Sequence, residues 1–315
     1  MDAVAWSIAR SVYPVLAGVA IVGVCLNSLL LLTTIFTKTL RSTSNILIGC
    51  CALFDVMHAT GYFIQFPILF SDYYIDSFYC SIMQFVPALG RAGGAVCVLC
   101  IGVDRMLVLL MAMRYQHTKK LYFLLCHFFT IVLFWGWTVY LMFAFWMKKQ
   151  QICSMPAPFH GDSLGLWTYS VTGVNILSAL VYFITWQVVK RKQISKHHKK
   201  IFTSIAIVMI VEVTGWFISS ILIDLSKIYV IPERRPPFHY IACLFVNSGI
   251  AVKAIVYYSI CAEYRHAIRS FLGIKKNRVV SSTTSRTSRA DDPNQASISL
   301  GAIKYAQNDN STQTE

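Results

Sequence analysis

Ionisable side chains inside long apolar segments are the residues of this chain best placed to do chemistry. Asp55, Arg91, Glu212 and Lys253 all stand in such segments. If the segments lie in a bilayer, a lone charge there costs about 3 kcal/mol or more, so these residues should pair or line a functional cavity. The chemistry that they offer is electrostatic: ion pairing, or the binding of a charged ligand.

Opposite signs decide which partners to expect. We expect Asp55 and Lys253 to form an ion pair, because pairing relieves two buried charges at once. Glu212 is the rival partner of Lys253. Arg91 has two open interpretations: it pairs with an acidic neighbour, or it anchors an anionic ligand, since a guanidinium binds such groups through paired hydrogen bonds.

Catalytic patterns are missing from the sequence. It holds no phosphate-binding loop, no zinc-ligand spacing and no nucleophile with a placed base. We therefore expect the chain not to be an enzyme and to need no cofactor or metal.

The elements that must position these residues are transmembrane helices. Of 315 residues, 56% are hydrophobic and 13% charged, with a mean hydropathy of +0.56, whereas a soluble domain carries about 25% charged residues. A bilayer core about 30 Å thick needs about 20 apolar residues per helix. We predict an all-α membrane fold, a bundle of seven transmembrane helices. The predicted spans are Val12–Phe36, Ser44–Phe70, Ser81–Met111, Leu121–Met147, Leu166–Val189, Ile201–Leu225 and Phe238–Ile260.

Basic residues set the predicted orientation. The first, third and fifth connections hold eleven lysines and arginines and no acid, whereas the other three together hold five lysines and arginines and four acids. Basic loops stay in the cytoplasm, so the N-terminus is expected outside and the C-terminus inside. The net charge of +14 thus reflects membrane orientation, and we expect no nucleic-acid partner.

The predicted domain organisation follows from these spans. Residues 1–11 form a short extracellular N-terminus and residues 12–260 the seven-transmembrane domain. Residues 261–274 form a helix on the membrane surface, because Tyr264, Ile268 and Phe271 share one face and Arg265 lies on the other. Residues 275–315 are polar and are expected to be a disordered cytoplasmic tail.

Particular residues resemble those of rhodopsin-like (class A) G-protein-coupled receptors. Asp104-Arg105-Met106 is similar to the family's Asp-Arg-Tyr triplet. Cys80 lies 25 residues before Arg105, about 38 Å along a helix, which spans the bilayer. Further residues that resemble the family's are Asn27, Asp55, Trp135, Trp216 and Tyr257. Tyr257 matches the tyrosine of the family's Asn-Pro-x-x-Tyr motif, and Lys253 stands where the asparagine of that motif would be.

Three segments, NILIGCCALFD, IGVDR and VYYSICAEYRHA, are similar to the nematode serpentine chemoreceptors of the SX class. The resemblance covers residues 12–272. It implies a chemosensory receptor in the plasma membrane, including that of a sensory cilium, which binds a small-molecule or peptide ligand and activates a heterotrimeric G protein. The alternatives are a neuropeptide-type receptor and a seven-helix membrane transporter.

The resemblance also implies roles for single residues. Cys80 and Cys153 form a disulfide over the pocket, and Asp104 holds Arg105 at rest, before Arg105 contacts the G protein. Arg91 and Trp216 are ligand-pocket candidates. The family's second-helix aspartate, here Asp55, helps to bind a sodium ion, and Lys253 would occupy the place of that cation. Serine and threonine residues of Ser281–Ser288 would bind arrestin once phosphorylated.

Overall fold

The computed structural model describes residues 3–71, 73–111, 115, 117–191, 196–231 and 234–274, without the side chains of residues 3, 196–202, 204, 205, 209 and 212. Seven of the described helices are long and apolar enough to cross a membrane. In chain order the elements are α1 (Ala3–Phe36), η1 (Lys38–Leu40), α2 (Thr43–Phe70), β1 (Ile75–Asp76), α3 (Ser77–Met83), α4 (Phe85–Leu110), α6 (Lys120–Ala144), β2 (Gln150–Gln151), α7 (Asp162–Arg191), α8 (Lys196–Tyr229), α9 (Arg235–Ile260) and α10 (Ala262–Phe271).

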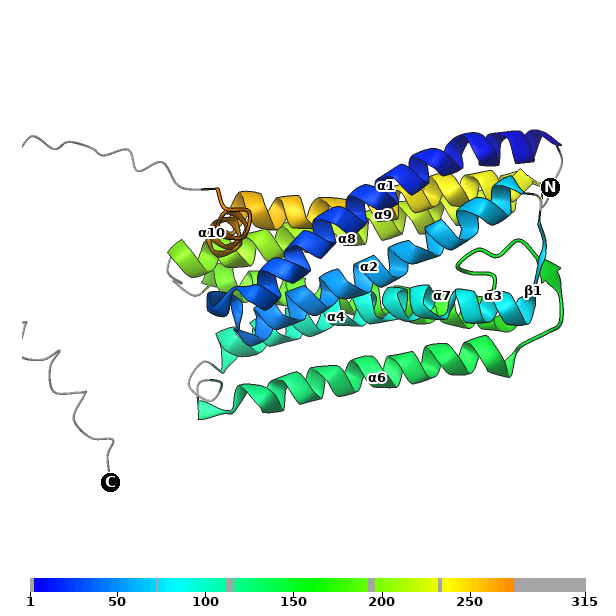
Figure 1. The fold of residues 1–315 in the computed structure, drawn as a ribbon. Helices are drawn as coiled ribbons and strands as arrows, with labels where there is room; N and C mark the ends of the chain where they lie inside the picture. The colour runs from blue at the N-terminus through cyan, green and yellow to red at the C-terminus, as the bar shows by residue number, and fades with distance from the viewer. Residues whose placement is uncertain are drawn as a thin grey trace, which may run out of the picture. The chain divides into compact units, whose positions relative to one another are not determined.

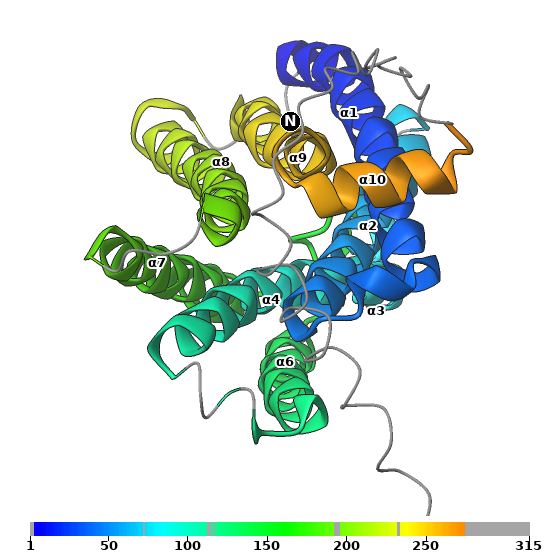
Figure 2. The same ribbon diagram turned by 90° about the vertical axis from the view of Figure 1, so that its left-hand side faces the viewer.

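The seven long helices run side by side as a bundle (Figure 1). Viewed from the end that carries α10, α4 lies among α2, α6 and α7, while α1 packs on α2 and α9 (Figure 2). The apolar core follows this arrangement, because α2 and α4 bury more than half of their apolar window and α6 buries only 22%. Residues on α2 and α4 therefore face other helices, and α6 mostly faces the surroundings.

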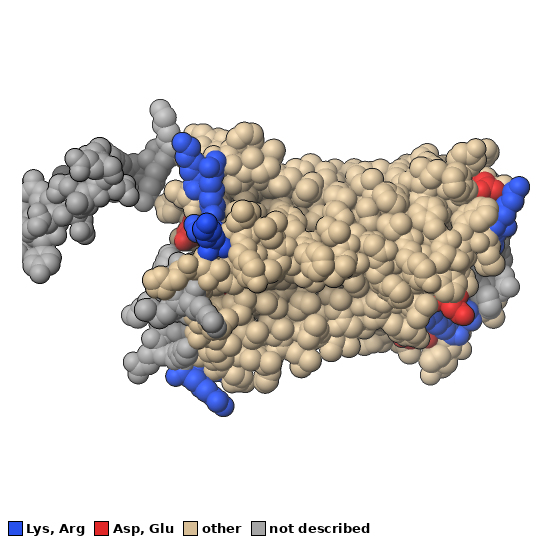
Figure 3. Space-filling model, turned by 90° about the horizontal axis from the view of Figure 1, so that it is seen from below, with Lys and Arg blue, Asp and Glu red and all other residues tan. Residues whose placement is uncertain are grey.

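The outer surface matches a bilayer. In the face shown in Figure 3, charged side chains gather at the two ends of the bundle and leave an uncharged band between them. Large apolar side chains of the membrane-crossing helices are exposed, as Phe129, Leu133 and Phe183 illustrate. A soluble protein rarely exposes so much apolar surface, so the band is the surface that meets lipid.

The predicted third span, Ser81–Met111, is interrupted in the structure. α3 ends at Met83 and α4 begins at Phe85, with Gln84 between them. Pro87 explains the break, because its ring has no N–H and clashes with the carbonyl of the residue four positions earlier, which is Met83. Helical hydrogen bonding resumes directly after the break, since the amide of Ala88 donates to Gln84 O at 2.9 Å.

The first helix is longer than the predicted span, which began at Val12. α1 starts at Ala3, and Ala5, Ala9 and Tyr13 on one of its faces are buried. Arg10 holds this extension against α2, because its Nε and Nη2 each donate to Leu69 O at 3.3 Å. Hydropathy indicates only the part of a helix that lies in lipid, so the prediction missed the first turns of α1, before Val12.

Candidate functional site

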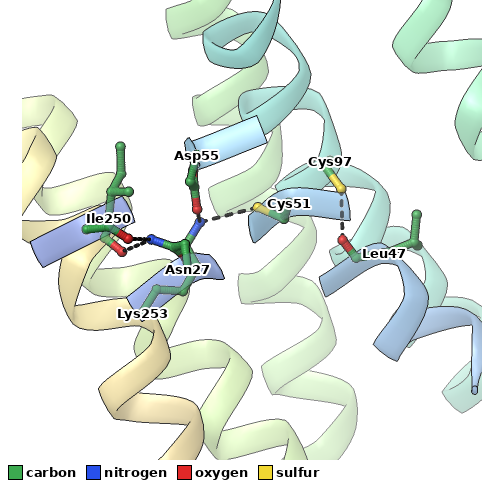
Figure 4. A network of polar contacts seen from close by, with 8 residues as sticks. Asn27, Leu47, Cys51, Asp55, Cys97, Ile250 and Lys253 are labelled. Atoms are coloured by element: carbon green, nitrogen blue, oxygen red, sulfur yellow. Dashed lines mark hydrogen bonds and ion pairs between the residues drawn. The ribbon is translucent and has the colours of Figure 1, made fainter. Parts of the chain in front are cut away.

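A buried polar centre joins four helices near the middle of the bundle (Figure 4). Lys253 Nζ of α9 lies 2.8 Å from Asp55 Oδ2 of α2 and 3.2 Å from Cys51 Sγ. The Lys253 and Asp55 side chains are only 2% and 5% exposed. The structure thus contains the ion pair expected between these residues, and the side chain of the rival partner, Glu212, lies outside the described part.

Asn27 and Cys97 extend this centre to α1 and α4. Asn27 Nδ2 donates to Gly23 O at 3.0 Å and to Ile250 O at 3.3 Å, which ties α1 to α9. Cys97 Sγ of α4 donates to Leu47 O of α2 at 3.2 Å. Together with the Lys253–Asp55 pair, these links connect all four helices.

Asp104 closes the intracellular end of α4. Its carboxylate is fully buried and accepts hydrogen bonds from Ser44 Oγ of α2 and, at 2.7 Å, from Tyr115 Oη. Burial, the main cause, and the hydrogen bond to Asp104 raise the pKa of Tyr115 to about 12. Asp104 therefore links α2, α4 and the loop after α4.

The structure does not contain the expected interaction between the side chains of Asp104 and Arg105. Within the described residues no ion pair or hydrogen bond joins the two side chains, and Arg105 Nε is buried without a hydrogen-bond partner. Successive residues of a helix point about 100° apart, so a carboxylate that faces α2 leaves its neighbour on another face. The sequence analysis did not identify Ser44 and Tyr115 as partners of Asp104, because neither residue belongs to a recognisable motif.

Tyr257 lies at the corner between α9 and α10. Its ring is buried and stands 5.3 Å from the ring of Tyr264 on α10. The Tyr264 hydroxyl in turn lies 3.3 Å from Thr34 Oγ1 and 3.4 Å from Asn45 O, on α1 and α2. The short helix predicted after the last span is thus present, and it is fixed to the intracellular ends of three helices.

The ligand-pocket candidates meet in the outer half of the bundle. The Arg91 guanidinium lies 3.0 Å from the centroid of the Trp216 ring, so α4 and α8 touch there. On α2, the buried His58 ring lies 5.6 Å from the Tyr62 ring, centroid to centroid. His58 was not expected, although a histidine inside the apolar run of α2 was the signal that could have found it.

The predicted disulfide is confirmed. Cys80 of α3 and Cys153 are bonded, with their Cα atoms 5.3 Å apart, and both are fully buried. Beside them β1 and β2 pair antiparallel, Ile75 with Gln151, so the loop after α6 is fixed to the outer end of α3. The arrestin candidates of Ser281–Ser288 lie outside the described residues.

A comparison with protein families identifies the architecture. The family model described as "Serpentine type 7TM GPCR chemoreceptor Srsx" matches residues 20–272. The match runs from within α1 through all later helices to the end of α10. A comparison with curated proteins finds no match.

Proposed function

Because the chain belongs to the Srsx family of serpentine seven-transmembrane G-protein-coupled chemoreceptors, we propose that it binds a small ligand in the outer half of the bundle and activates a heterotrimeric G protein. The coupling surface in this proposal is the intracellular end of α4, around Asp104 and Arg105. The receptor acts in the plasma membrane of a chemosensory cell, with its N-terminus outside.

The intracellular end of α4 carries this proposal. Arg105 is half-buried there, and its Nε has no hydrogen-bond partner among the described residues. The neighbouring carboxylate is occupied by Ser44 and Tyr115. A guanidinium that is placed at the surface but not neutralised by its neighbour is suited to donate hydrogen bonds to a carbonyl or carboxylate of a docking protein.

The polar centre supplies a path between the two ends. A ligand that shifts α8 at Trp216 also acts on α9, because α8 and α9 pack along each other. The Lys253–Asp55 pair then transmits that shift to α2, and Asp104 connects α2 to the intracellular loop. Signalling of this kind needs two arrangements of the helices, with ligand and G protein favouring the same one.

Nucleotide exchange tests the proposal. The full chain is placed in phospholipid nanodiscs with purified G-protein heterotrimers of each class, and GTP-analogue binding is measured with and without a panel of odorants and peptides. We expect exchange with at least one class, abolished by Arg105→Ala and retained by Arg41→Ala, a matched change at an exposed arginine before α2. Solute or ion flux without exchange on any class would favour a transporter instead.

A further inference from the structure

Two arginines of α10 bond to the last turn of α9. Arg269 Nε donates to Tyr258 Oη at 3.1 Å, and the guanidinium carbon lies 5.8 Å from the centroid of the Tyr258 ring. Arg265 Nη1 donates to Ser259 O at 3.4 Å. The two arginines are four residues apart, so they lie about 40° apart around α10 and about 6 Å apart along it. The corner between α9 and α10 therefore carries two guanidinium groups on one face.

The protein does not neutralise this pair of charges. Among the described residues, no acidic side chain forms an ion pair with Arg265 or Arg269. Glu263 lies about 200° from Arg265 around the helix, on the opposite side of α10. A guanidinium has five N–H groups, and each arginine uses one of them on α9. Most of their N–H groups therefore remain for a ligand that accepts hydrogen bonds.

The position of the two arginines is fixed by the other face of α10. Tyr264, Ala267 and Ile268 on that face are buried. The Tyr264 hydroxyl lies 3.3 Å from Thr34 Oγ1, which holds α10 across the end of the bundle (Figure 2). The guanidinium groups are thus presented at the level where the membrane-spanning helices end.

An exposed face of α9 continues from this corner into the membrane. Ser259, Ile255 and Val252 are exposed, and their spacing of four and three residues places them on one face of the helix. From Ser259 to Val252 this face runs about 10 Å toward the middle of the bilayer. One leaflet of the hydrocarbon core is about 15 Å thick. An acyl chain on this face would therefore bring its headgroup to the two arginines.

We propose that this corner binds one anionic phospholipid of the inner leaflet. Arg265 and Arg269 donate to the phosphate oxygens, while the Tyr258 hydroxyl fixes Arg269, and an acyl chain lies on Ile255 and Val252. Arginine matches two oxygens of a phosphate with parallel hydrogen bonds. The inner leaflet is the one that carries anionic lipids. A zwitterionic lipid would bring a cation to the same place, where two arginines repel it.

Two lipids with the same acyl chains separate headgroup charge from general lipid binding. The full chain in detergent is titrated with dioleoyl phosphatidylglycerol or dioleoyl phosphatidylcholine, and bound lipids are counted by native mass spectrometry. We expect one phosphatidylglycerol to bind about tenfold more tightly than phosphatidylcholine, because each arginine attracts the negative headgroup. Glycerol 3-phosphate, which has the phosphate but no acyl chains, should bind far more weakly than the lipid.

Variants assign the binding to the two arginines. Arg265→Gln and Arg269→Gln should each weaken phosphatidylglycerol binding about fivefold, and together about 30-fold. Lysine at both positions keeps the net charge but loses the planar fork, so this variant should still lose affinity. Tyr258→Phe removes only the hydroxyl that holds Arg269 and should weaken binding about threefold.

The intracellular end of α7 offers a matched control. Lys190 and Arg191 are exposed basic residues in its last turn, and Lys190 Nζ lies 5.5 Å from the centroid of the Trp186 ring. Replacing both by glutamine removes the same charge from another helix end that also carries an aromatic ring. Phosphatidylglycerol binding should be unchanged in this variant.

Three results would overturn the lipid site. They are equal affinity for the two lipids, equal affinity for glycerol 3-phosphate and the whole lipid, and a loss in the α7 control as large as in the Arg265→Gln, Arg269→Gln variant. The site does not depend on nucleotide exchange. A chain that binds phosphatidylglycerol through the two arginines and activates no G protein keeps this site and counts against the proposed function.

Discussion

Asp55 and Lys253 place opposite charges on α2 and α9 within hydrogen-bond distance, in the buried interior of the bundle. Each charge makes the other tolerable, because an isolated carboxylate or ammonium there would carry the full desolvation penalty. Cys51 adds a soft acceptor at 3.2 Å from the ammonium. The interior of this receptor therefore carries its own cation at the second-helix aspartate.

The first prediction concerns this ion pair. Asp55→Asn and Lys253→Asn should each destabilise the protein by about 3–5 kcal/mol, because each leaves an unpaired buried charge. The double variant should be less destabilised than either single one. Thermal unfolding of the four proteins in nanodiscs measures the coupling, and a value near zero would show that the pair contributes no mutual stabilisation. Agonist affinity should also vary little with sodium, since the ammonium fills the cation position.

The second prediction concerns Asp104. Tyr115→Phe keeps the ring, which stacks on Phe123 with centroids 4.4 Å apart, and removes only the hydroxyl that donates to Asp104. Loss of one donor to a buried carboxylate should cost about 1.5–3 kcal/mol. We expect a lower melting temperature, faster amide exchange at the described residues 117–119, and altered basal nucleotide exchange.

Ser44→Ala removes the other donor and should act in the same direction. Phe123→Leu is the control, since it reduces ring stacking and leaves both hydrogen bonds to the carboxylate in place. If Tyr115→Phe changed neither stability nor loop exchange, while Phe123→Leu changed both, the loop would be held by its aromatic stack and not by Asp104.

At the scale of elements, close approach of α2 and α4 brings the polar groups together. Gly90 lets the backbones meet, because a Cβ added there would lie 2.5 Å from His58 N and 2.7 Å from Phe54 O. These are backbone atoms, which cannot turn aside as a side chain can. The contact sets the position of Arg91, the next residue of α4, relative to α2.

The third prediction follows from that contact. Gly90→Ala should force α2 and α4 apart and destabilise the protein by about 1–3 kcal/mol, as overpacking does in a filled interior. Gly136→Ala in α6 is the matched control, because nothing lies within 4 Å of an added Cβ. It should be neutral or slightly stabilising, since alanine favours a helix. Equal melting temperatures for the two variants would contradict the close packing.

On the scale of the whole molecule, charge and hydropathy divide the chain into two ends and a lipid-facing band. The disulfide, β1 and β2 lie at one end, and α10 lies at the other (Figure 1). The helices α2, α6 and α8, which follow the basic connections in the sequence, begin at the end that carries α10. An oxidising exterior for Cys80–Cys153 and a cytoplasm for the basic loops agree with this single orientation.

The fourth prediction tests that orientation. An epitope tag before Met1 should bind antibody on intact cells, and a tag after Glu315 should bind only once the membrane is permeabilised. A Lys38→Glu, Arg41→Glu variant, which reverses charge in the first connection, should lower the correctly oriented fraction. Staining of the C-terminal tag on intact cells would reverse the assignment of G-protein and ligand faces.

What the sequence determined by itself is the part that depends on local composition. Apolar length and basic loops predicted seven spans, and the short helix after them was expected from its two-faced pattern. Charge signs and family spacing predicted the Asp55–Lys253 and Cys80–Cys153 contacts. The spans could be predicted because the apolar length of a segment shows whether it lies in lipid. The ion pair could be expected because a buried charge needs a partner of opposite sign, although the sequence left Glu212 as a second candidate.

Only the tertiary structure decided which hydroxyls and rings surround the functional charges. Ser44 reaches Asp104 across 60 residues of chain, and Arg91 rests on Trp216 of a helix much later in the sequence. Such contacts depend on how far each helix is rotated and how closely it approaches its neighbours. Helix rotation and the distance between helices are set by small residues such as Gly90 and by packing along whole helices, so they cannot be predicted from a local sequence pattern.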